Sequence, residues 1–243
     1  MAGYWSDTRA PRYSFVFAFP LLLLYEALAH LISGASGVRN GADVLLKSLF
    51  SLLGGAHGLT AFAVVVLGSG LALIIHDWRK SGAPQGRYFA GMAVESVLYA
   101  LLFGGVTSTL TGLVLQGPSA LSQAAVAPPG LDMGTELMVS LGAGFYEELV
   151  FRVLIVAALA KLATGGFGWR PWVGGAFATV LGAFIFSAFH YIGPLGDDLQ
   201  LTSFVFRMIA GLLLSALFLL RGFGVAAWTH ALYDVFLTVR GLG

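Results

Sequence analysis

Long apolar stretches, separated by short polar segments, run along nearly the whole of this 243-residue chain. A helix needs about 20 apolar residues to cross the hydrocarbon core of a bilayer, and seven stretches reach or approach that length. They cover residues 13–33, 59–76, 88–115, 134–160, 172–192, 201–220 and 222–239. The pattern predicts an all-α fold, a polytopic transmembrane helical bundle of about seven, and between six and eight, spanning helices.

Residues 43–54 form a further apolar segment that leaves the helix count open. One face of the segment is apolar, but it carries Lys47 and is too short to span comfortably. We therefore expect an interfacial or re-entrant helix there. A full span at this position would raise the count to eight.

The first apolar stretch, residues 13–33, also resembles the core of a signal peptide. Arg9 and Arg12 precede it, and residues 27–29 read Ala-Leu-Ala. Titratable residues bracket that triplet, however, and the apolar run is long. These features favour a retained membrane anchor over a cleaved leader.

The composition supports a membrane protein and excludes several other classes. Hydrophobic residues make up 58% of the chain and charged residues 10%, whereas a soluble domain has about 25% charged residues. So few charges exclude an ordinary cytosolic protein, and a net charge of +1 offers nothing to attract nucleic acid. Because the sequence has no cysteine, disulfides, thiolate catalysis and cysteine-ligated metal centres are ruled out.

The distribution of lysine and arginine predicts the orientation, because these residues are enriched in cytoplasmic loops. The loops 116–133 and 193–200 carry no cation and are expected on the outer side. We therefore predict a multi-pass protein with a cytoplasmic N terminus. The high content of Ala, Gly and Leu and the absence of cysteine favour the inner membrane of a bacterium. With that topology, eight cations lie on the cytoplasmic side: Arg9, Arg12, Arg79, Lys80, Arg87, Lys161, Arg170 and Arg221.

Glycine is frequent, with 33 residues, and much of it lies inside predicted helices. Small residues allow the backbones of membrane helices to approach closely. We expect this role for Gly174, Gly175, Gly182 and Gly211.

Ionisable side chains at membrane depth are the strongest functional signal, because each costs about 2.5 kcal/mol or more unless it has a partner. For Glu26 and Glu95 three interpretations stay open: a place in a substrate groove, an ion pair with Arg207, or a position at the membrane interface. The set is Glu26, Glu95, Glu136, Glu147, Glu148, Arg152, His190, Arg207, His230 and Asp234, and His30 is a further candidate.

The segment Glu-Glu-Leu-Val-Phe-Arg places two carboxylates side by side in an apolar helix. Glu148 and Arg152 are four residues apart and share one face, which predicts an ion pair. Glu147 points about 100° away and is free for another task, such as general acid–base catalysis. The alternative is a salt bridge to another helix that uses both glutamates.

Two later helices bring further polar groups. His190 ends the run Phe-Ser-Ala-Phe-His, and His230 and Asp234 share a face at a spacing of four residues. Asp234 is expected to orient the imidazole, or to bind a metal ion or a substrate oxygen together with it. Burying such groups around one wet cavity costs less than burying them apart. We therefore expect one site, with Glu147, His190 and His230 around a bound water.

In this order on successive helices, Glu-Glu-x-x-x-Arg, Phe-x-x-x-His and His-x-x-x-Asn/Asp resemble the motifs of the CPBP family. These are the CAAX-prenyl-protease and bacteriocin-processing intramembrane endopeptidases, also called the Abi family. The resemblance covers about residues 134–239 and implies that the last four helices form the CPBP core. It divides the chain into N-terminal helices, residues 1–133, and a catalytic core, residues 134–243.

The resemblance implies a role for each motif residue. Glu147 corresponds to the general base that activates water, and His190 to the residue that holds and polarises this water. His230 and Asp234 correspond to the pair that stabilises the oxyanion, with Asp234 standing where some members have Asn. Glu148 and Arg152 would support the site.

A divalent metal such as Zn is a second possibility at this site, with Glu147, His190 and His230 as its candidate ligands. The sequence lacks the His-Glu-x-x-His spacing of zinc peptidases. We therefore expect no obligatory cofactor.

The expected function is cleavage of a membrane-anchored or lipid-modified protein or peptide at the bilayer, with no nucleic-acid partner. Bacterial members of the family mature leader peptides or remove C-terminal sorting signals, as the myxosortases do. The alternatives are a transporter or proton-conducting protein, since such proteins also use buried Glu and His, and a non-catalytic immunity or scaffold protein on the same fold. A transporter usually shows inverted repeats, and none is visible.

Overall fold

The computed structural model describes residues 3–116, 131–193 and 196–241, and in these ranges the chain is helical without any strand. The N-terminal helices are α1 (Tyr4–Asp7), α2 (Pro11–Ser36), α3 (Gly41–Gly54), α4 (Gly58–Ser81) and α5 (Gly86–Leu115). A long helical segment follows, made of α6 (Met133–Gly142), η3 (Ala143–Glu147), η4 (Leu149–Val156), α7 (Ala157–Lys161) and η5 (Leu162–Gly166). The last three helices are α8 (Pro171–Phe189), α9 (Leu201–Arg221) and α10 (Phe223–Val239).

Within the described ranges, six helical stretches are long and apolar enough to cross a membrane, which places the chain among multi-pass integral membrane proteins. They match six of the seven expected spans. The seventh, α10, is apolar but shorter, at 17 residues.

The apolar segment at residues 43–54 forms helix α3, which is not a separate membrane span. After the short turn Gly55–His57 the chain begins α4, and α3 and α4 pack against each other. The turn is tight, because a Cβ at Gly58 would lie 2.4 Å from the Phe50 carbonyl oxygen. Together α3 and α4 form one continuous apolar stretch, Gly41–Ser81.

Polar side chains fix the start of two helices that matter for the site. The side chain of Asn40 accepts hydrogen bonds from the amides of Ala42 and Asp43 and so caps α3. Asp132 caps α6 in the same way, through the amides of Gly134 and Thr135. Hydrogen bonds from the Thr135 side chain and amide lower the pKa of Asp132 below its usual value.

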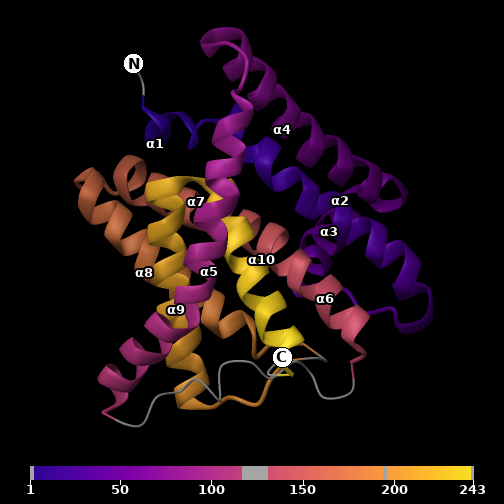
Figure 1. Cartoon of the computed structure of the whole chain (residues 1–243), viewed down its shortest axis with the longest axis vertical. Helices are drawn as coiled ribbons and strands as arrows, with labels where there is room; N and C mark the ends of the chain where they lie inside the picture. Colours follow the sequence, from indigo (N-terminus) through magenta and orange to yellow (C-terminus); the bar gives the residue numbers. More distant parts are fainter. Residues whose placement is uncertain (1–2, 117–130, 194–195, 242–243) are drawn as a thin grey trace.

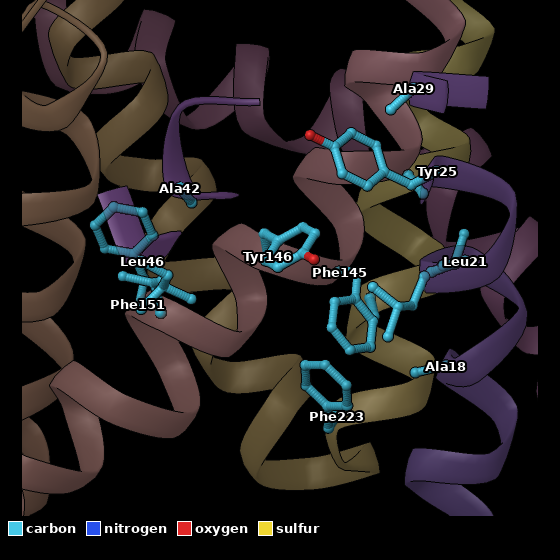
Figure 2. Close-up of a cluster of buried hydrophobic side chains, with 14 of the residues drawn as sticks. Ala18, Leu21, Tyr25, Ala29, Ala42, Leu46, Phe145, Tyr146, Phe151 and Phe223 are labelled. Atoms are coloured by element: carbon cyan, nitrogen blue, oxygen red, sulfur yellow. The ribbon is translucent and has the colours of Figure 1, made fainter. Parts of the chain in front are cut away.

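Helix α10 lies in the interior of the bundle and packs against α2, α5, α6 and α9 (Figure 1). The main hydrophobic cluster takes side chains from both ends of the sequence. In Figure 2, Leu21 and Tyr25 of α2 meet Phe145 and Tyr146 of η3, and Phe223 of α10 lies beside Phe145. The core thus crosses the expected boundary at residues 133 and 134, and the division at that point stays a prediction.

Glycines bring three pairs of helices close together. A Cβ at Gly174, Gly182 or Gly211 would meet side-chain or backbone atoms of a neighbouring helix at 2.8, 2.5 and 3.1 Å, respectively. The expectation was wrong for Gly175, where nothing lies within 4 Å. Gly174 and Gly175 are adjacent in α8, so only Gly174 points at the neighbouring helix.

Candidate active site

The two adjacent glutamates lie in an unusually wound part of the long central segment. Residues Ala143–Glu147 and Leu149–Val156 follow π-helical turns, which are wider than α-helical turns and recur at functional sites. Two glycines precede the glutamates. A Cβ at Gly142 would lie 2.6 Å from the Tyr25 ring, and one at Gly144 would lie 2.5 Å from the Ala231 side chain. The segment therefore packs closely against α2 on one side and α10 on the other.

Glu147 is buried, with 7% of its surface exposed, and its two carboxylate oxygens have different surroundings. Oε1 accepts a hydrogen bond of 2.9 Å from Nδ2 of Asn40. Oε2 lies 3.9 Å from Nε2 of His190 and 4.0 Å from Nε2 of His230. No side chain or backbone group of the described residues donates a hydrogen bond to Oε2.

Glu148 points elsewhere and is fully buried. Its Oε1 lies 3.0 Å from Nη1 of Arg152 and 2.8 Å from Nδ1 of His230. The predicted pairing of Glu148 with Arg152 is confirmed. The alternative of a salt bridge to another helix that uses both glutamates stays open, because Glu147 and Glu148 each lie near a histidine of another helix.

Arg152 is held by three kinds of contact. Besides Glu148, its guanidinium lies over the Phe186 ring, 4.4 Å from the ring centre, and Nη2 donates to the Gly211 carbonyl oxygen at 3.4 Å. Arg152 therefore links the central segment to α8 and α9 while it balances the charge of Glu148.

The partners of the two histidines fix how their rings face Glu147. Nδ1 of His190, at the C-terminal end of α8, lies 2.8 Å from the Phe186 carbonyl oxygen. Because a carbonyl only accepts, Nδ1 carries the hydrogen, and Nε2 of a neutral ring is an acceptor directed at Glu147. In His230, Nδ1 is directed at Glu148 and Nε2 at Glu147.

Asp234 lies one turn after His230 on α10, with Oδ2 3.5 Å from His230 Nε2. The expected shared face is confirmed. It is Glu148, however, that occupies Nδ1 of His230, so Asp234 approaches the ring from the Nε2 side. The side chain of Asp234 is 29% exposed, which leaves it open to a bound molecule.

The described residues do not form a ready-made set of metal ligands. Among the described residues, no group of three or more His, Asp or Glu side chains is arranged to hold a metal ion. The expectation that no cofactor is obligatory stays a prediction.

Asn40 was not predicted from the sequence as a site residue, but it belongs to the site through its hydrogen bond to Glu147. One signal was available, because Asn followed by Gly-Ala-Asp is typical of a helix N-cap. That signal predicts the cap of α3 but not the contact with Glu147.

A polar cluster, called the Glu26 cluster below, contacts the backbone of Asn40. Its contacts show that one expectation for Glu26 was wrong. Glu26 accepts hydrogen bonds from Lys47, Arg39 and Tyr146 at 2.9, 3.2 and 2.8 Å, so its pairing with Arg207 was wrong. Asp43 and Tyr25 complete the cluster. Its members are Tyr25, Glu26, Arg39, Asp43, Lys47 and Tyr146, together with the backbone of Asn40.

Arg39 stands outside the membrane spans and keeps its charge. Burial alone would lower the pKa of Arg39, but its hydrogen bonds to Asp43 and Glu26 outweigh this effect and raise the pKa. The cluster thus contains two paired acids and two paired bases.

Arg207 and Glu95 are half-buried and pair away from the carboxylates of the site. Arg207 forms an ion pair with Asp197 and lies over the Tyr191 ring, next to His190 in the sequence. Glu95 pairs with Arg221 at 2.7 Å, where Arg221 also contacts Thr8 and the Trp5 carbonyl oxygen. Pairing of Glu95 with Arg207 was therefore wrong as well.

Residues 130–236 match the family described as type II CAAX prenyl endopeptidase Rce1-like, a span that contains all six motif residues. This part of the chain is similar to that family. No curated protein and no solved structure matches the chain.

The match supports a peptide hydrolase with the CAAX-type endopeptidase activity of an intramembrane enzyme. The family match and the membrane-spanning helices together fit a membrane-associated protein substrate in contact with the bilayer. The match agrees with the resemblance to the CPBP motifs at Glu147, His190 and His230.

Proposed function

We propose that Glu147 is the general base of this endopeptidase and activates a water molecule for attack on a peptide carbonyl. The observation that carries the proposal is the position of Glu147 Oε2, buried and 3.9 and 4.0 Å from Nε2 of His190 and His230. These separations exceed direct hydrogen bonds and suit one water molecule that contacts the carboxylate and an imidazole at once.

The hydrogen-bond donors and acceptors around Glu147 support its role as the general base. Nε2 of neutral His190 and Oε2 of Glu147 are both acceptors, so a water between them donates one hydrogen to each. Its lone pairs are then directed away from both groups and toward a substrate. His190 thereby holds and polarises the water that Glu147 deprotonates.

In the hydrolysis that we propose, Glu147 transfers one proton from the water to the leaving nitrogen. The water oxygen bonds to the peptide carbon as its proton passes to Glu147 Oε2, which gives a tetrahedral intermediate with a negatively charged oxygen. The carbon–nitrogen bond breaks as Glu147 returns the proton to the leaving nitrogen. The products are a new carboxyl terminus and a new amino terminus, and the carboxylate is regenerated.

His230 is placed to stabilise the intermediate. Its Nδ1 donates to Glu148, and a second hydrogen on Nε2 makes the ring an imidazolium that donates to the oxyanion. The carboxylates of Glu148 and Asp234, on opposite sides of the ring, favour this charged form. Asp234 adds a direct hydrogen bond to the oxyanion only when it is protonated, because an ionised carboxylate has no hydrogen to donate.

For the substrate we propose a secreted bacterial protein that keeps a C-terminal sorting signal or a leader in the inner membrane. The support is the expected N-in topology, which places His190 near the outer end of its span. Much of the outer loop 116–133 lies outside the described residues. Labelling single cysteines in this loop with an impermeant reagent tests the topology, and protection from the outside would overturn it.

The direct test replaces Glu147 by Gln in the native membrane and compares membrane and surface proteins with the wild type by mass spectrometry. Gln keeps an acceptor for Asn40 but cannot take a proton from water. We expect a precursor to persist uncut, which identifies both substrate and cleavage site.

The matched control is Glu136→Gln, an identical exchange in the first turn of α6. Wild-type processing is expected for this variant. If Glu147→Gln is correctly inserted and every protein matures normally, Glu147 is not the base. Loss of ion flux in that variant would then favour the proton-conducting alternative, and loss of partner binding alone would favour a non-catalytic scaffold.

A further inference from the structure

We propose that Asn40 is a positioning residue for catalysis: its side-chain amide holds one oxygen of Glu147 and leaves the other as the only oxygen available to water. This inference rests on the role of Glu147 proposed above. It assigns part of the active site to the N-terminal helices, outside the matched segment 130–236.

The hydrogen bonds of Asn40 determine which way its amide faces. Its Oδ1 accepts from the amides of Ala42 and Asp43 at 2.9 and 3.4 Å, which requires the oxygen to face α3. The NH₂ group must then face Glu147, where Nδ2 donates to Oε1 at 2.9 Å. One side chain thus caps a helix and donates to the candidate base.

The hydrogen bond from Asn40 fixes the orientation of the Glu147 carboxylate. Oε1 is engaged by Asn40, whereas Oε2 has no hydrogen-bond donor among the described protein groups and faces the two Nε2 atoms. Without the amide, the carboxylate can rotate about its last bond and present either oxygen, or neither, at the distance that the water requires. A fixed carboxylate avoids that loss of orientation.

Close packing keeps Asn40 in place. It is 2% exposed, and a Cβ at Gly142 would lie 2.9 Å from the Cβ of Asn40. The next residue, Gly41, borders the end of α8, because a Cβ there would lie 3.2 Å from the Phe189 ring. The start of α3 is therefore wedged between the segment that carries Glu147 and the helix that ends at His190.

The Glu26 cluster anchors the backbone of the same residue. The amide of Asn40 donates to the Tyr25 hydroxyl at 3.2 Å, and this hydroxyl donates to Asp43 at 2.7 Å. Asp43 is in turn held by Arg39 and Lys47 at 2.9 and 2.7 Å. The backbone and the side chain of Asn40 are thus both fixed before a substrate binds.

The first test is kinetic and separates the two tasks of Asn40. In Asn40→Ser the hydroxyl still caps α3 but is too short to reach Glu147, so we expect a kcat about 10- to 100-fold lower, from the loss of a hydrogen bond to a charged group, with KM little changed. Asn40→Ala should have the same low kcat and reduced thermal stability as well. The cap control is Asp132→Ala, which removes the cap of α6 without touching Glu147 and should keep a normal kcat per folded molecule.

A second measurement needs no activity and also applies if one variant is unstable. Thermal stabilities of wild type, Asn40→Ser, Glu147→Ala and the double variant form a cycle that isolates the bond between the two side chains. We expect Asn40→Ser to lower the melting temperature less in the Glu147→Ala background than in the wild type.

Additive melting shifts, or a wild-type kcat in Asn40→Ser, would overturn the positioning role. The failure of the proposed function looks different, because processing would then continue normally in Glu147→Gln whatever the cycle shows.

Discussion

His230 and Glu148 are joined by a 2.8 Å contact between Nδ1 and Oε1, although 82 residues separate them in the sequence. The same carboxylate oxygen lies 3.0 Å from Arg152. Glu148 therefore balances a buried guanidinium and fixes the imidazole that faces Glu147, so the second glutamate of the pair serves structure and orientation together.

The first prediction separates these two tasks of Glu148. Glu148→Gln leaves Arg152 without its acidic partner and should destabilise the protein by about 3 kcal/mol, because an uncompensated charge stays buried. In the double variant Glu148→Gln with Arg152→Met the uncompensated charge is gone, so most of the stability should return. Activity should stay low in both, because neither variant has an anion at Nδ1 of His230. Thermal unfolding in detergent and the processing assay measure the two effects, and recovery of activity together with stability would contradict the prediction.

The second prediction concerns the contact between η3 and α10. Gly144→Ala places a methyl group 2.5 Å from the Ala231 side chain and the Ala227 carbonyl oxygen, so the helices must move apart. We expect a loss of about 1–3 kcal/mol in stability and a lower kcat, since Glu147 and His230 separate. Gly175→Ala, with nothing within 4 Å, is the control and should be as stable as the wild type or more stable. Equal behaviour of the two variants would show that the close approach is not required.

The third prediction addresses Asp234, where some members of the family have Asn. An amide at this position can donate to an oxyanion directly, whereas a methyl group cannot. Asp234→Asn should therefore stay active within about threefold, and Asp234→Ala should lose about tenfold or more in kcat. Steady-state kinetics on the identified substrate measure both. If the two variants are equally impaired, the negative charge next to His230, and not a donor, is what the site needs.

The fourth prediction is a pH dependence of stability that arises outside the membrane spans. The pKa of Asp132 is lower in the folded protein than its ordinary value of 3.8, because Thr135 and Gly134 donate to the carboxylate. The stabilisation is therefore complete above pH 3.8 and is lost as the pH falls through the lower folded-state pKa. Asp132→Asn should melt below the wild type at neutral pH, and the difference should shrink on acidification. A difference that grows as the pH falls would contradict this sign.

The fifth prediction concerns metal ions. Glu147 Oε2 lies 3.9 and 4.0 Å from the two Nε2 atoms, while Glu147 Oε1 and both Nδ1 atoms are engaged by protein groups. This arrangement suits a water molecule, and we expect activity to survive dialysis against a chelator. Loss of activity that added Zn²⁺ restores would make Glu147, His190 and His230 metal ligands.

The spacing of residues along helices accounts for what the sequence could predict. Glu148 with Arg152 and His230 with Asp234 are four residues apart, and helical geometry alone brings each pair together. The apolar stretches likewise predicted the spans, because length and hydropathy are local properties.

The parts that could not be predicted depend on which helices are neighbours. Glu26 of α2 pairs with Lys47 of α3, and not with Arg207, because α4 packs against α2 and α3 packs against α4. Asn40 reaches Glu147 over 107 residues of sequence, and no periodicity encodes that contact. The cost of buried charges predicted that partners exist, but not which ones.

The shared core of α2, α3, η3 and α10 bears on how the matched segment can be used by itself. Lipid tails can replace the apolar contacts of Leu21 or Ala42 at small cost, because they are as apolar as the side chains that they displace. They offer no hydrogen-bond donor, so nothing in a bilayer substitutes for the amide of Asn40. Residues 130–236 grafted onto foreign helices would therefore keep much of their shape in lipid. Glu147 would, however, lack the hydrogen bond that Asn40 donates to its Oε1.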